Sequence, residues 1–390
     1  MKKRTAAVDQ PFRLRDPYGA LSMPVYHSVA FEFDDAATMS DAFCGRLAMP
    51  DYARVMNPTV TYFEDKVKAI TGAADVTAFN SGMAAISNCL MALAASGKNI
   101  VTSRHLFGNT FSLIAKTLVR FGVRPKLCDL TDIEQVRKTV DENTCCVFLE
   151  IITNPQMEVA DLSALSEVAH SVGAPLVADT TVIPFTEFRS HDMGVDVEVV
   201  SSTKYISGGA TSLGGLVIDY GTHPTLAKTI NFEMLFNMGA YMTPHVAYMQ
   251  SLGLETLEVR YHAQAANAQL LAERLSNVQA IKRVNYIGLK DNPYYGLARK
   301  QFGGTSGAML TIDLENQEAC YAFMNSLKLV RRATNLFDHK TLAIHPASTI
   351  FGNFTDRQRA QMDVLDTTIR ISVGLEDNDD IFNDIVQALP

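Results

Sequence analysis

The chain has 390 residues, of which 47% are apolar and 19% are charged. Its length indicates about two or three domains, and the charged share lies below the usual share of about 25%. Acidic residues exceed basic residues by 42 to 34, so the formal net charge is −8, which disfavours nucleic acid or an anionic membrane as a partner. The low charge predicts an oligomer subunit, because the covered part of a surface carries few charges.

No apolar stretch approaches the roughly 18 residues that a membrane-spanning helix needs. The basic start, Met1–Arg4, is followed by no apolar run, so a secretory leader is not expected. The six cysteines form no Cys-x-x-Cys pair, which favours reduced core residues over a disulfide framework. We therefore expect a cytoplasmic protein.

Residues 1–50 contain repeated prolines and no clear periodicity, which predicts an extended arm. An arm of this kind can wrap a neighbouring subunit, and an irregular terminus is the alternative. From about residue 60 the predicted helices and strands alternate, and capping boxes at Thr61–Glu64 and Thr131–Glu134 predict helix starts. The expected strands are 77–79, 99–102, 124–128, 145–150, 175–179, 197–201 and 216–219, and the expected helices are 61–72, 82–95, 110–121 and 162–172.

Continuous apolar strands that alternate with helices predict a mostly parallel sheet covered on both faces. After about residue 245 the pattern changes to a long helix at 254–275 and shorter elements. We predict an arm at 1–50, a large domain at 51–245 and a smaller C-terminal α/β domain at 246–390. The later expected strands are 308–314, 341–344 and 369–373, with helices near 317–327 and 355–364.

Ligands of an open parallel sheet bind beyond the carboxyl ends of its strands. Ser81, Gly82 and Met83 follow one predicted strand and open a helix, where free N–H groups can bind an anion or phosphate. An ordinary serine N-cap is the alternative.

Asp179 ends a second apolar strand. A carboxylate there needs a partner: a helix N-terminus, a metal or a protonated ring nitrogen. A metal is the least favoured of the three, because no cluster with zinc-like spacing lies nearby.

Lys204 follows a third apolar strand, directly after Ser201, Ser202 and Thr203. Burial lowers the pKa of a lysine and makes its amine a nucleophile, whereas an exposed lysine on an apolar stem is the ordinary alternative. A phosphate cradle, a carboxylate and a nucleophilic lysine together are the groups that pyridoxal phosphate needs.

Several phrases extend this pattern over about Met49 to Asp377, and with them the chain resembles the cystathionine γ-synthase-like family of pyridoxal-phosphate enzymes. That resemblance implies the type I, aspartate-aminotransferase-like transferase fold. The phrases are Tyr52–Arg54 with Asn57–Thr59, Ser81–Ala85, Asn154-Pro155, Ser201–Tyr205 and Arg370–Asp377.

The resemblance implies that Lys204 binds the cofactor covalently and moves protons at the substrate and cofactor carbons. It also implies that Arg370 holds the substrate α-carboxylate, as a planar bidentate donor does well, with Asn154 and Asn335 as further substrate-binding residues. Tyr52 and Arg54 match a pair that reaches the phosphate of a neighbouring subunit. The implied assembly is therefore a dimer with shared sites, and by family habit a tetramer. The remaining implied phosphate contacts are Ser81, Gly82, Met83, Ser201 and Thr203.

Two positions depart from the family pattern. Phe107 stands where the family has a tyrosine stacked on the cofactor; it keeps an aromatic face but has no phenol, so acid–base work would pass to Tyr52 or Lys204. Asp179 is aligned with the partner of the pyridinium nitrogen, although a shift that places Ala178 there is the alternative.

The stretch Asn335–Thr349 resembles O-acetylhomoserine sulfhydrylases, as does Gly253–Leu257. This implies γ-replacement on an acylated homoserine by sulfide or a thiol. The alternatives are a methionine or cystathionine γ-lyase, a cystathionine γ-synthase, and a non-catalytic scaffold of the same fold.

Overall fold

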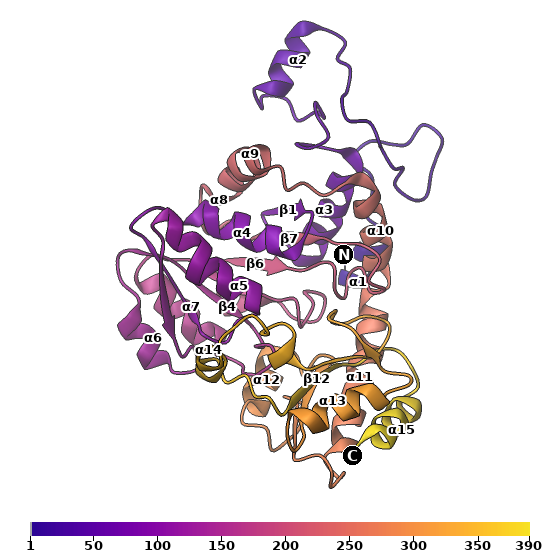
Figure 1. The fold of residues 1–390 in the computed structure, drawn as a ribbon. Helices are drawn as coiled ribbons and strands as arrows, with labels where there is room; N and C mark the ends of the chain where they lie inside the picture. Colours follow the sequence, from indigo (N-terminus) through magenta and orange to yellow (C-terminus); the bar gives the residue numbers. More distant parts are fainter. Residues whose placement is uncertain (1) are drawn as a thin grey trace.

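The computed structural model describes residues 2–390, and its larger sheet has seven strands in the order β1-β7-β6-β5-β4-β2-β3. Only β7 runs antiparallel to its neighbours, so the predicted mostly parallel sheet is confirmed. Both faces are covered, as Figure 1 shows. The strands are β1 (Asp75–Phe79), β2 (Asn99–Ser103), β3 (Arg124–Cys128), β4 (Thr144–Glu150), β5 (Leu176–Asp179), β6 (Val197–Val200) and β7 (Gly215–Asp219).

Successive strand residues enter different cores because side chains alternate across a sheet. Val147 packs in a core with Phe63 of α3 (Pro58–Thr71), whereas Phe148 packs in a second core with Leu90 of α4 (Gly82–Leu93). Both faces of these strands are buried, so their sequences are continuous apolar runs. The other helices of this part are α5 (Gly108–Ser112), α6 (Ile133–Thr139), α7 (Leu162–Ser171), α8 (Leu226–Thr229) and α9 (Phe236–Met238), with π-helices at Leu113–Thr117 and Ile230–Leu235 and 3₁₀ turns at Leu118–Phe121 and Ser190–Met193.

The predicted start of α3 is wrong by about one turn. Asn57 accepts a hydrogen bond from the Thr59 N–H (3.0 Å), and Pro58 occupies the first helical position, where proline is favoured. The end is as predicted, because Gly72 takes the left-handed conformation at φ 73° that closes many helices. At α6 the cap is likewise Asp132 and not the expected Thr131.

A second sheet of five strands, in the order β10-β11-β12-β9-β8, forms the C-terminal part. A single buried core contains Leu216 of the large sheet and Ile371 of the small one, so the two parts are tightly packed. The domain boundaries at 50/51 and 245/246 stay a prediction. The elements are β8 (Arg283–Asn285), β9 (Met309–Asp313), β10 (Arg331–Arg332), β11 (Leu342–Ile344), β12 (Thr368–Ser372), α12 (Tyr295–Gln301), α13 (Gln317–Ser326), α14 (Asp356–Gln361) and α15 (Asn378–Ala388).

The long helix predicted at 254–275 is α11 (Leu257–Leu275), which begins three residues later than expected because a separate helix, α10 (Pro244–Glu255), ends just before Thr256. At the end of α10, a Cβ on Gly253 would lie 2.0 Å from the Ile206 carbonyl oxygen. The break and the glycine together let α10 pack against the segment that follows Lys204.

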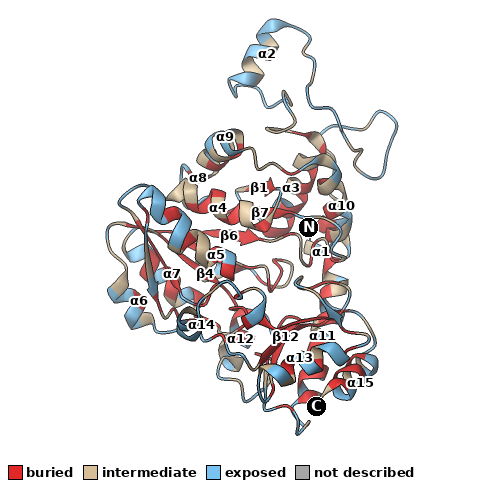
Figure 2. Ribbon diagram, in the orientation of Figure 1, coloured by how far each residue is buried: buried red, intermediate tan, exposed pale blue. Residues whose placement is uncertain are grey.

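The N-terminal residues are not uniformly an arm. Residues Lys3–Val8 form a helix, α1, that contacts α3 and α10 and buries Ala6 and Ala7. Within residues 9–52, Phe12 packs on Tyr62 and Arg13 bonds Asp65, both of α3, whereas the part that carries the helix α2 (Ala36–Phe43) projects from the body (Figure 1). Figure 2 shows this segment largely exposed, and Tyr18 and Leu21 keep more than nine-tenths of their surface. Among the described residues, none of the helices combines the length and hydropathy needed to cross a membrane.

Candidate active site

Lys204 lies in the turn that follows β6, and its amine donates to Asn335 Oδ1 at 2.8 Å. Asn335 belongs to the C-terminal part of the chain and donates in turn to Asp338 Oδ2 at 3.2 Å. Burial and the nearby charge of Arg370 lower the pKa of Lys204 to about 8, against the opposing effect of Asp179 and Asp338. The lysine is therefore a largely buried amine with a weakened hold on its proton.

Two carboxyl groups lie side by side at the ends of neighbouring strands, because Glu150 of β4 pairs with Asp179 of β5. Burial and the charge of Asp179 raise the pKa of Glu150 to about 8. Burial also raises the pKa of Asp179, although hydrogen bonds from Thr181 and the charge of Lys204 oppose the shift. Of the two aligned candidates, Asp179 is thus the one whose charge acts on Lys204, while Ala178 is wholly buried on the other face.

Glu150 is a residue that sequence reasoning missed, although it ends an apolar strand as Asp179 does. Its Oε1 accepts the Phe107 backbone N–H at 2.6 Å. Phe107 is thereby tied to the edge that holds both carboxyl groups.

The start of α4 lies against the turn that carries Lys204. A Cβ on Gly82 would lie 2.6 Å from Ser201 Cβ, so only glycine allows this approach. The Ser81 hydroxyl caps α4 by accepting the Ala84 N–H at 3.1 Å, as its alternative role predicted. The N–H groups of Gly82 and Met83 lie in the first turn, where a helix offers them no internal acceptor.

Ser201 and Thr203 differ in how their groups are used. The Ser201 N–H donates to the Thr181 hydroxyl at 2.8 Å. The Ser201 hydroxyl itself lies beside Gly82, at the start of α4. The Thr203 hydroxyl donates to the Gly214 carbonyl at 3.1 Å and accepts from the Gly214 N–H at 3.0 Å. The predicted phosphate contact of Thr203 would replace only the bond that its hydroxyl donates to the Gly214 carbonyl, because the hydroxyl oxygen can still accept the Gly214 N–H.

Arg370 of β12 is 2% exposed, and burial lowers its pKa to about 9. It donates to Asn154 Oδ1 at 3.4 Å and to the carbonyl oxygens of Thr334 and Asn335 at 3.2 Å each. Its Nε has no hydrogen-bond partner among the described residues. A buried cation with an unused donor is suited to an anionic ligand.

Tyr52 and Arg54 are not brought to this edge within the chain. The Arg54 guanidinium lies 5.5 Å from the Tyr52 ring and donates to the Phe236 carbonyl, and Tyr52 is 44% exposed. In the described part of the chain, no hydrogen bond joins either of them to Lys204. Their predicted role requires a second subunit.

The other residues fit pyridoxal phosphate. The first turn of α4 with Ser201 offers donors for a phosphate, Asp179 offers a carboxylate for a ring nitrogen, and Lys204 offers an amine for an aldehyde. The unused Arg370 donor is available to an anionic ligand. These groups come from α4, from β5, from the turn after β6 and from β12 of the small sheet.

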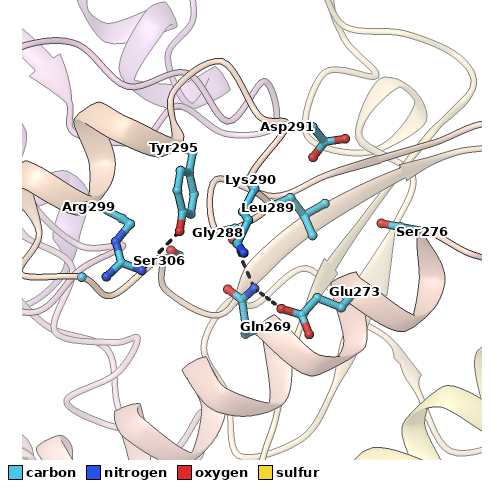
Figure 3. Close-up of a pocket in the computed structure, with 11 residues that line it drawn as sticks. Gln269, Glu273, Ser276, Gly288, Leu289, Lys290, Asp291, Tyr295, Arg299 and Ser306 are labelled. Atoms are coloured by element: carbon cyan, nitrogen blue, oxygen red, sulfur yellow. Dashed lines mark hydrogen bonds between the residues drawn. The ribbon is translucent and has the colours of Figure 1, made fainter.

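A hollow of about 470 Å³ lies apart from these residues, between α11 and α12. Its polar groups bond to one another: the Gln269 amide donates to Glu273 at 2.7 Å, and Arg299 donates to the Tyr295 hydroxyl at 3.3 Å (Figure 3). It contains none of the predicted site residues. Among residues 2–390, no group of three or more His, Cys, Asp or Glu side chains could hold a metal.

Fold and site together define a pyridoxal-phosphate-dependent enzyme of the type I fold. The family model for Cys/Met metabolism PLP-dependent enzymes matches residues 4–390. The chain belongs to that family, so the predicted family, enzyme class and cofactor are confirmed.

The relatives carry two kinds of names. The chain is 36% identical to an L-methionine gamma-lyase of Fusobacterium nucleatum over 96% of this chain and 95% of the relative. It is 35% identical to an O-succinylhomoserine sulfhydrylase of Pseudomonas aeruginosa, over 96% and 92% respectively. A crystal structure from Campylobacter jejuni, assigned as an O-acetylhomoserine (thiol)-lyase and holding a pyridoxyl-lysine phosphate at its position 205, superposes with a TM-score of 0.95. It is 30% identical and covers 100% of this chain and 99% of its own.

Proposed function

We propose that this enzyme carries out γ-replacement on an O-acylated homoserine, with O-acetylhomoserine as the favoured substrate and sulfide or a thiol as the second substrate. The γ-carbon–oxygen bond breaks, a carbon–sulfur bond forms at the same carbon, and the acyl group leaves as its carboxylate. With sulfide the amino-acid product is homocysteine. The names of the Pseudomonas and Campylobacter relatives support this class of reaction.

Pyridoxal phosphate, when bound, accepts the electron pair left at the substrate Cα after proton loss. Lys204, with its pKa lowered to about 8, is the base for that proton and its carrier to neighbouring carbons. Asp179 would keep the ring nitrogen protonated. Arg370, through its unused Nε, would hold the substrate α-carboxylate beside Asn154 and Asn335.

The observation that carries the choice of substrate is Phe107. The backbone N–H of Phe107 donates a hydrogen bond to Glu150, which holds the residue at the catalytic edge, meaning the carboxyl ends of β4, β5 and β6. Its side chain has no hydroxyl to protonate a leaving group. A carboxylate such as acetate is a weak base and leaves without a strong acid beside it. An acylated homoserine therefore suits this site better than a substrate that loses a thiolate.

The second subunit is part of the proposal. Tyr52 and Arg54 lie at the base of an exposed arm with large uncovered apolar side chains, and we propose that they complete the phosphate site of a neighbouring copy. The assembly is then a dimer with shared sites, or a tetramer of two such dimers. Cytoplasm as the location, and the absence of nucleic-acid and membrane partners, are proposed on the composition alone.

The test is a coupled assay in which acetyl-, succinyl- and phospho-homoserine are each supplied with sulfide. Homocysteine and the free acid are expected in equal amounts, with the acetyl ester preferred. Release of 2-oxobutyrate and ammonia without homocysteine would instead establish γ-elimination.

Methionine γ-lyase activity is the second candidate, because the Fusobacterium lyase is as similar to the chain as the sulfhydrylase is. Its products from methionine would be methanethiol, 2-oxobutyrate and ammonia. A higher kcat/KM for methionine than for every acylated homoserine would replace our proposal with this one.

A further inference from the structure

A buried histidine lies between two carboxylates beside the catalytic edge. His105 follows β2 and is 4% exposed. Its Nδ1 bonds Glu158 Oε2 at 2.5 Å, and its Nε2 bonds Asp363 Oδ2 at 2.8 Å. None of the roles assigned above uses this group.

The three partners belong to three segments that surround the site. His105 lies two residues before Phe107, on the loop tied to Glu150. Glu158 closes a turn with Thr153, through bonds of 3.1 and 3.0 Å, and this turn carries Asn154, the acceptor of Arg370.

Asp363 comes from the small part of the chain, in the segment 346–364. This segment packs closely on the loop, next to α5 (Figure 1): a Cβ on Gly108 would lie 2.7 Å from the Ile350 carbonyl oxygen, and the Phe111 and Phe354 rings lie 5.9 Å apart. Gln156 also donates to the Met362 carbonyl at 2.5 Å. Asp363 itself has φ 52°, an uncommon backbone conformation that aspartate tolerates.

The charges around His105 favour its protonated form. Burial alone would lower the pKa of the imidazole, but the hydrogen bonds and charges of Glu158 and Asp363 raise it above its ordinary value. Asp129 also faces this group. Arg104 lies 3.8 Å from Asp363, and its Nε lies 3.4 Å from His105 Nε2, a long contact that the imidazolium would give up because its Nε2 would then carry a proton. A protonated imidazole donates through both nitrogens, whereas a neutral one donates through one.

We propose that His105 is a positioning residue: as an imidazolium it latches segment 346–364 onto the loop of Phe107 and the turn of Asn154. The latch holds the aromatic face and the Arg370 acceptor in the arrangement that the reaction needs. This inference rests on the proposed function, because it assumes that Phe107 and Asn154 face the cofactor and substrate.

The latch depends on pH with a definite sign. Because the pKa of His105 is raised in the folded protein, its protonation stabilises the folded arrangement fully at pH values below the ordinary histidine pKa of about 6.5. This stabilisation is lost as the pH rises through the raised pKa. The loop of Phe107 should therefore loosen on the alkaline side.

The test uses the holoenzyme with His105→Gln, and His170→Gln as the matched control, because His170 also bonds a carboxylate, Asp196 at 2.7 Å, but on α7. Hydrogen exchange is measured over residues 104–108 and 346–364 at several pH values, alongside kcat and KM. In His105→Gln the protection of both segments should fall about tenfold, as expected for loss of a charged hydrogen bond. Its kcat/KM should fall about tenfold to a hundredfold, as misplacement of a reacting group does.

The pH dependence separates positioning from general destabilisation. Wild type and the control should lose protection in both segments as the pH rises, after correction for intrinsic exchange, and His105→Gln should not. Equal protection and kinetics in His105→Gln and wild type, or identical effects in the control, would overturn the latch.

Asp363→Asn is a second test variant, and it should fold normally because the Asp363 side chain is 59% exposed. Asp363→Asn should shift exchange and kcat/KM in the same direction by a smaller factor, and an unchanged Asp363→Asn protein would overturn the latch as well. If the proposed function is wrong, the wild-type protein will turn over no acylated homoserine. Hydrogen exchange in wild type and the variants can still be compared in that case, so the latch is tested separately.

Discussion

The catalytic edge of the large sheet and the arm at residues 9–52 are expected to serve the same phosphate, yet they are built in opposite ways. The edge is buried, and its groups hold one another: Glu150 accepts from Phe107, and Lys204 donates to Asn335. The arm is largely exposed, and Arg54, just beyond its end, contacts Tyr52 and the backbone carbonyl of Phe236. The difference teaches that one chain can bring the reacting groups together, whereas, under the shared-site proposal, a second copy would have to close the site.

The largest effect is expected when Lys204 is removed from the catalytic edge. Lys204→Ala should abolish the yellow cofactor absorbance and lower kcat by about a thousandfold or more, because both the covalent anchor and the proton carrier are removed. Visible spectroscopy and steady-state kinetics check this, with the variant Lys138→Ala, at an exposed lysine, as control. A yellow, active Lys204→Ala protein would show that another amine does the work.

The next effect tests whether the arm serves a neighbour. Arg54→Ala should weaken cofactor binding by about a hundredfold, the size of a lost charged hydrogen bond to phosphate. When Arg54→Ala and Lys204→Ala subunits are unfolded together and reassembled, about one quarter of the native sites should return, because each mixed dimer contains one intact site. No recovery in the mixture would place Arg54 in its own chain's site.

A smaller effect is expected at Arg370, and it tests whether the C-terminal part of the chain binds the substrate carboxylate. Arg370→Lys should raise KM for the amino-acid substrate by about tenfold to thirtyfold and change kcat less, because lysine cannot reproduce the planar, multidentate contact. The exposed Arg299→Lys serves as control. An effect on kcat alone would instead indicate that Arg370 acts through Asn335 and Lys204.

The smallest effect concerns the leaving group. Phe107→Tyr restores a hydroxyl without changing the backbone bond to Glu150, and should change kcat/KM for O-acetylhomoserine by less than about tenfold while raising turnover of thiol-losing substrates such as cystathionine. Product analysis by chromatography measures the ratio, with Phe111→Tyr as control. An unchanged ratio would mean that the phenol has no role at this position.

The sequence by itself determined the class of this protein. Continuous apolar strands that alternate with helices predict a parallel sheet, and Ser81–Met83, Asp179 and Lys204 stand out because each lies at or just beyond the carboxyl end of such a strand. Glu150 ends an apolar strand just as Asp179 does, but its role depends on the pairing of β4 with β5 and on the Phe107 N–H that it accepts, and neither contact is visible in the sequence.

Only the tertiary structure decided which segments meet. Helix starts shifted from the capping boxes at Thr61 and Thr131 to Asn57 and Asp132, because competing caps differ by little free energy and packing selects among them. The helix α1 joined the core although its sequence lacks a strong period, since burial against α3 and α10 outweighs local preference. Contacts such as Lys204 with Asn335 and His105 with Asp363 join residues 131 and 258 positions apart, and no local pattern encodes a pairing that forms only when the chain closes on itself.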